Sequence, residues 1–223
     1  MEAGWRLKSL LRSKRFFTTP ELVRLYKAQL LSYLDSSTPA LYHVAASVLA
    51  GIERVQLRFQ REIGLSEFEA LNNFRLAPLK SRRDMAMLGI LHKVNLGTAP
   101  PQLQALVPKL GNTDEVPMKQ ILCDWRPPRS KQFATHASFT SSNVLKRSLF
   151  GLVHCDNRLP QHPVDTSSVQ RFQRKLRHGL LQHAELGASD WQALYSTGWR
   201  KLLGRKLKAG RTVSLVIPQQ NCA

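Results

Sequence analysis

Residues 77–93 read APLKSRRDMAMLGILHK, and this stretch decides the fold that we expect for the chain. It predicts a helix over residues 79–94 whose apolar side chains form one broad arc. Arg82, Gly89 and Lys93 fall on the opposite side. We therefore expect one face of this helix to pack and the other to be exposed and cationic.

Arg83 departs from that pattern, because on the same helix it projects over the apolar arc. We expect it to cover the core or to pair with Asp84 or Glu69. The alternative is a phosphate contact.

Two capping boxes predict where helices begin in the region before this stretch. In each, a hydroxyl residue is followed three positions later by glutamate. The boxes are Thr18 with Glu21 and Ser66 with Glu69, and they predict helices over about residues 19–35 and 67–73.

A second long helix is expected after Ser47, and Gly64 is a natural stop for it. Three arginines, Arg54, Arg58 and Arg61, form a stripe away from its apolar side. The expected buried seam is Val48, Ile52, Val55, Phe59 and Ile63.

The character of the chain changes over residues 97–142, which are rich in proline and poor in periodic apolar residues. A structureless stretch of that length is uncommon inside one compact domain, so two lobes are expected. The fold should be mostly α, and residues 212–217 are the one possible strand. The expected parts are a helical N-terminal lobe (1–96), a Pro-rich arm (97–142), a smaller basic helical C-terminal lobe (143–210) and a tail (211–223).

Within the C-terminal lobe, a helix over residues 143–156 should end in a turn at residues 157–160. A further helix should begin near Ser168. Its expected buried residues are Val169, Phe172, Leu176 and Leu180, and its expected exposed ones are Arg171, Arg174, Lys175 and His178.

The chain is strongly basic, with 223 residues, a formal charge of +18 and a pI near 10.6. Such a surface attracts polyanions, of which nucleic acid is the first candidate. The alternatives are a ribosome-type or merely soluble basic protein and a membrane-surface binder.

Three cysteines, odd in number and far apart, indicate a reducing compartment, so we expect an intracellular protein, nuclear or cytoplasmic. No stretch predicts a membrane span. The basic first 17 residues also mimic a transit peptide.

Four motifs then occur in an order that carries a family resemblance, and the last of them spans two consecutive stretches. LVRLYKAQLLSYLDSSTPALYH (22–43) precedes LAGIERVQLRFQREIG (49–64) and residues 77–93, and KRSLFGLVHCDNRLP (146–160) leads into SSVQRFQRKL (167–176). Together they resemble the region after the thumb in reverse transcriptases of non-LTR (LINE-type) retrotransposons. That family closes this region with Trp-Asn-x-Leu-Pro and a phenylalanine-centred helix. Asn157, Leu159, Pro160 and Phe172 match this pattern, whereas Asp156 replaces the usual aromatic residue.

The resemblance implies a piece of an enzyme that copies element RNA into DNA, in which this part grips template or target duplex. Polymerases hold two Mg²⁺ ions with closely spaced aspartates, but the seven aspartates here are scattered singly. We therefore expect no catalysis by this chain, with the polymerase portion missing upstream.

The remaining chemistry is equally sparse. No zinc-type spacing and no glycine-rich phosphate loop occurs, so we expect no cofactor, no metal and no small-molecule substrate. Cys155 is either a helix-packing residue or a nucleophile beside His154 or His162.

The candidate site is therefore a cationic surface for RNA or DNA that is largely independent of sequence. The alternatives are solvated helix faces, a helical protein-interaction domain and a truncated retroelement relic without selected function. Trp5, Trp191 and Trp199 either stack on unpaired bases or pack internally. The candidate cations are Arg54, Arg58 and Arg61; Arg82 with Lys93; and Arg171, Arg174, Lys175, Arg200, Lys201, Arg205, Lys206 and Lys208.

Overall fold

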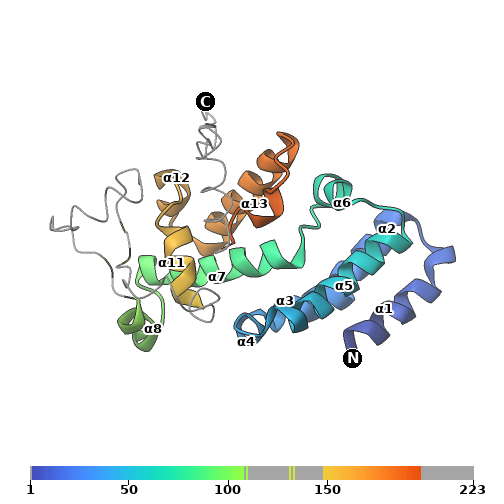
Figure 1. Cartoon of the computed structure of the whole chain (residues 1–223), viewed down its shortest axis with the longest axis horizontal. Coiled ribbons are helices and arrows are strands. Elements are labelled where there is room, and N and C mark those ends of the chain that lie inside the picture. The colour runs from blue at the N-terminus through green and yellow to red at the C-terminus, as the bar shows by residue number, and fades with distance from the viewer. Residues whose placement is uncertain (1, 108, 110–130, 132, 134–147, 197–223) are drawn as a thin grey trace. The chain divides into compact units, whose positions relative to one another are not determined.

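A computed structural model describes residues 2–107, 109, 131, 133 and 148–196, and these are mostly helical (Figure 1). The predicted mostly α fold is confirmed. Within the described ranges, β pairing is limited to an isolated antiparallel bridge between Lys109 and Phe133. The chain divides into two compact units, residues 1–83 and residues 84–223. This boundary falls inside α7 (Leu79–Leu96), earlier than the expected lobe boundary at residue 96.

The first unit is a set of short and long helices around one apolar core. Tyr26 stacks on Phe59 in that core, with ring centroids 4.2 Å apart. The helix of Thr18 runs on through one π-turn, η2, into α3. The elements are α1 (Glu2–Arg12), η1 (Lys14–Phe16), α2 (Thr19–Tyr26), η2 (Lys27–Leu31), α3 (Ser32–Ser36), α4 (Thr38–Leu41), α5 (Ala46–Glu62), α6 (Glu67–Phe74) and the start of α7 (Leu79–Leu96).

Both predicted capping boxes form. The Thr18 N–H donates to the Glu21 carboxylate at 2.8 Å. In the second box the Glu69 N–H donates to the Ser66 hydroxyl at 3.2 Å, and the Ser66 N–H donates to the Glu69 carboxylate at 2.9 Å. The helix starts at α2 and α6 are therefore confirmed.

The buried seam of α5 is only partly as expected. Phe59 is fully buried, and Ile52, Val55 and Ile63 are partly buried against the core. Val48, however, is 53% exposed, so its expected burial is wrong. Gln56 and Gln60 are buried instead. Gln56 donates from Nε2 to the carbonyl of Ala77 at 3.1 Å and so ties α5 to the turn before α7.

The second unit packs α13 against the rest of α7. Phe172, Leu176 and Leu180 of α13 are buried as predicted, whereas Val169 is only half-buried. The hydroxyl of Tyr195 donates to the carbonyl of Leu176 at 2.8 Å. The elements described are α8 (Pro101–Leu106), α11 (Leu149–Asp156), α12 (Gln161–Val164), α13 (Val169–Glu185) and η4 (Trp191–Ala193).

Three described residues of the expected arm are buried in the core, namely Ala99, Val107 and Phe133. Phe133 is fully buried, and its main-chain N–H and C=O both bond to the side chain of Asn157 at 2.9 Å. Asn157 begins the predicted turn after α11, and both Asn157 and Asp156, the last residue of α11, are fully buried. At this point the arm is a structural part of the second unit.

The expected exposed face of α7 is only partly present, because Lys93 is exposed but Gly89 is buried and Arg82 is half-buried. Gly89 is buried against Val169 and Gln173 of α13, since a Cβ placed on it would meet Val169 Cγ1 at 3.3 Å. His92, one turn on, stacks on Phe172 with ring centroids 4.2 Å apart, and its Nε2–H donates to the Thr166 carbonyl at 2.9 Å. A helix that packs on more than one side needs no amphipathic pattern.

Candidate nucleic-acid interface

The clearest cationic surface of the first unit is a stripe on α5. Arg54, Arg58 and Arg61 are spaced four and three residues apart, so they lie on one side of the helix, and all are exposed. None of them forms an ion pair within the described part of the chain. Their guanidinium groups are therefore open to phosphate oxygens, which they suit as planar multiple donors. We call these residues the α5 stripe.

A second cationic surface lies on α13, opposite its buried residues. Arg171 and Arg174 are exposed and, within the described residues, have no ion pair. Lys175 is half-buried, and its ammonium donates to the carbonyl of His162 at 2.9 Å. This arrangement leaves Arg171 and Arg174 as the two free cations of the predicted α13 group, with His178 exposed one turn further on.

The third predicted surface, Arg82 with Lys93, does not form. Arg82 is half-buried and pairs with Asp35, with Nε 3.2 Å from Oδ1. Lys93 is exposed but belongs to the other unit. Because its charge is neutralised internally, Arg82 is removed from the candidate interface.

Arg83 has a structural role, as expected, but a different partner. It is 7% exposed and forms an ion pair with Glu53 of α5, rather than with Asp84 or Glu69. This partner could not be predicted from the sequence pattern, because the pattern does not indicate that α5 packs next to the start of α7.

Several predicted residues lie outside the described part of the chain. They are Trp199, the possible strand at 212–217, the tail at 211–223, and the cations Arg200, Lys201, Arg205, Lys206 and Lys208.

The other two candidate tryptophans differ in exposure. Trp191 is half-buried in η4, whereas Trp5 on α1 is 73% exposed. Lys8 and Arg12 are exposed on the same side of α1, three and seven residues after Trp5. The sequence analysis did not predict this basic face, although the spacing of three and four residues between Trp5, Lys8 and Arg12 places them on one side of a helix.

The described residues offer little to alternative chemistries. Burial, with a smaller effect of Asp84, raises the pKa of the Cys155 thiol to about 12, so this cysteine stays protonated near neutral pH. No group of three or more His, Cys, Asp or Glu side chains gathers where a metal could bind in the ranges that the structure covers. Within the same ranges, no helix has the length and apolar character to span a membrane.

Comparison of the chain with protein-family models, with curated proteins and with solved structures gave no match.

Proposed function

We propose that this chain binds RNA or DNA through basic helix faces, without catalysing a reaction and largely without regard to sequence. The observation that carries the proposal is the α5 stripe, three exposed arginines that have no ion pair in the described residues of a chain with a formal charge of +18. Each phosphate that they neutralise releases a counterion, which favours binding at low salt.

The resemblance to the region after the thumb of LINE-type reverse transcriptases supports the same proposal. In this reading the chain grips template or target duplex, and the polymerase portion lies upstream of it. The scattered cysteines fit a reducing compartment, so we place the protein inside cells, in the nucleus or cytoplasm.

A protein-interaction domain is the second candidate, and exposed apolar side chains favour it. Val48 and Leu57 of α5 are 53% and 44% exposed, and Phe16 beside α1 is 68% exposed. A partner that covered these side chains would bind with little salt dependence, because apolar burial is not screened. The two candidate functions therefore predict different results when the affinity for nucleic acid is measured as a function of salt concentration.

That measurement is a binding titration with labelled RNA and DNA of unrelated sequences at low and moderate salt. We expect micromolar affinity, similar for each sequence, that falls steeply with salt. Affinity that stays constant as salt rises would contradict the proposal. Primer extension with Mg²⁺ tests the non-catalytic part, and nucleotide incorporation by this chain alone would overturn it.

A further inference from the structure

An open groove of about 550 Å³ runs between α1 and the helical stretch formed by η2 and the start of α3. Trp5 and Ser9 line it from α1, and Gln29 and Tyr33 line it from the opposite side. A volume of this order accommodates a small planar ligand. Trp5 both lines the groove and remains 73% exposed, so its indole stands at the rim.

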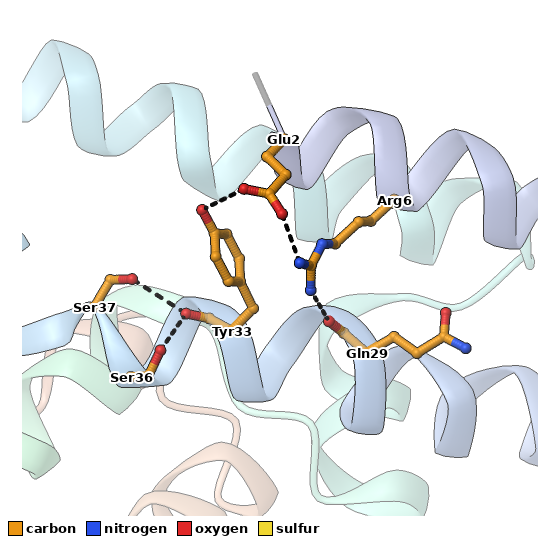
Figure 2. Close-up of polar contacts among 6 residues, drawn as sticks. All are labelled: Glu2, Arg6, Gln29, Tyr33, Ser36 and Ser37. Carbon is orange, nitrogen blue, oxygen red and sulfur yellow. Dashed lines mark hydrogen bonds and ion pairs between the residues drawn. The ribbon is translucent and has the colours of Figure 1, made fainter.

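A polar network links the two walls of the groove (Figure 2). The Arg6 guanidinium pairs with the Glu2 carboxylate at 2.5 Å and lies 4.6 Å from the centroid of the Tyr33 ring. The Tyr33 hydroxyl donates to the other Glu2 oxygen at 3.3 Å. The guanidinium of Arg6 therefore lines the groove with its charge neutralised by Glu2. Any positive charge that attracts a ligand must come from other residues.

The wall across from α1 contains the π-turn. In η2 the N–H of Ser32 bonds to the carbonyl of Lys27, five residues back, which widens the helix locally. The Gln29 carbonyl in this turn accepts a hydrogen bond from Arg6 Nη1 at 3.3 Å (Figure 2). π-helical geometry is rare, and single π-turns inside α-helices are frequent at functional sites.

The charge comes from the exposed face of α1. Lys8 and Arg12 follow Trp5 on that face, and within the described residues neither has an acidic partner. Their Cα atoms are about 6 Å apart along the axis, because each helical residue rises about 1.5 Å. An aromatic ring at a groove, continued by two cations along a helix, is the pattern of a single-strand binding surface.

Resting on the proposed function above, we propose that this groove takes one unpaired base of a single-stranded RNA or DNA. The base stacks on Trp5, and Lys8 and Arg12 contact the phosphates that follow. A duplex keeps its bases inside the helix and cannot fill the groove, so it engages only the cations.

The test compares Trp5→Ala with Phe16→Ala, a matched loss of an exposed aromatic side chain that does not line the groove. Binding is measured for a single strand, in RNA and DNA forms, and for a duplex of the same length. A single strand with abasic sites supplies the same phosphates without bases. Circular dichroism checks that each variant stays folded.

We expect Trp5→Ala to weaken single-strand binding about fivefold to a hundredfold, the range of one lost stacking contact. Its duplex binding should be unchanged, and Trp5→Tyr should recover part of the loss. The wild type should lose a similar factor on the abasic strand, whereas Trp5→Ala should not distinguish the abasic strand from the normal one. The stronger of the RNA and DNA arms identifies the strand.

If Trp5→Ala binds single strands as well as Phe16→Ala does, the groove is not a base site. The same conclusion follows if Trp5→Ala weakens duplex binding equally. Those results leave the proposed function standing, provided that the wild type binds nucleic acid with a steep salt dependence. Absence of any wild-type binding would refute the proposed function as well.

Discussion

At the scale of single residues, Arg82 and Arg83 show how neighbouring cations are assigned. Their acidic partners lie 47 and 30 positions away in the chain, at Asp35 and Glu53. The helical pattern correctly indicates that Arg83 points to the packed side, since that depends only on its own helix. Neither partner follows from the pattern, because both depend on which helices pack together.

The Arg83–Glu53 pair gives a stability prediction. Arg83→Ala leaves the Glu53 carboxylate, one-third exposed, without its cation, so we expect a loss of about 2 kcal/mol in the free energy of unfolding. Arg54→Ala, which removes an exposed arginine from the same region, should change it by less than about 0.5 kcal/mol. Urea denaturation followed by circular dichroism measures both. Equal stability of the two variants would show that the pair contributes nothing.

At the scale of helices, the capping boxes predict a pH dependence. Hydrogen bonds from the main chain and hydroxyl of Thr18 and Ser66 lower the pKa of Glu21 and Glu69 below the ordinary value of 4.5. A lowered folded-state pKa gives stabilisation that is complete above the ordinary value and is lost as the pH falls through the lowered one.

We therefore expect the variant Glu21→Gln/Glu69→Gln to have a lower Tm than the wild type at neutral pH. The difference should close as the pH is lowered below the ordinary value of 4.5 and the wild-type carboxyls take up protons. Thermal melts across this range provide the measurement. A difference in Tm that is independent of pH would show that the carboxylate charge is not involved.

The capping boxes were predictable because their signal lies within four residues, whereas the surroundings of α7 were not. The helical pattern of α7 predicts that Gly89 faces solvent. It is instead buried by Val169 and Gln173 of α13, a helix about 80 residues further along the chain. Phe133 is a similar case, since its burial depends on the side chain of Asn157. The α5 stripe was predictable, because a solvent-facing stripe needs no partner.

The close approach at Gly89 predicts the effect of a larger side chain. Gly89→Leu would meet Val169 and Gln173, and we expect a loss of about 1–3 kcal/mol in the free energy of unfolding, as for other overpacked sites. Lys93→Leu places the same side chain at an exposed position of α7 and should change stability by less than about 0.5 kcal/mol. Urea denaturation measures both, and similar midpoints would mean that α13 does not pack against Gly89.

At the scale of the whole molecule, the excess of positive charge is spread over both units. The α5 stripe belongs to the first unit, and Arg171 with Arg174 belongs to the second. Internal pairing uses part of the charge, as Arg6, Arg82 and Arg83 show. Net charge alone therefore overestimates the cations available to a ligand, and the useful quantity is the number of arginines that release counterions on binding.

The number of those arginines can be measured from the salt dependence of duplex binding. If the α5 stripe contacts phosphates, Arg54→Gln/Arg58→Gln/Arg61→Gln should reduce the slope of log K against log salt by about 2.7, since each phosphate contact contributes about 0.9. The matched control removes the same charge at Arg15, Arg24 and Lys80, exposed residues on three different elements. Its slope should change far less, because those residues form no common face. Equal changes in the two triple variants would mean that the protein attracts nucleic acid by its overall charge and that the α5 stripe is not a binding surface.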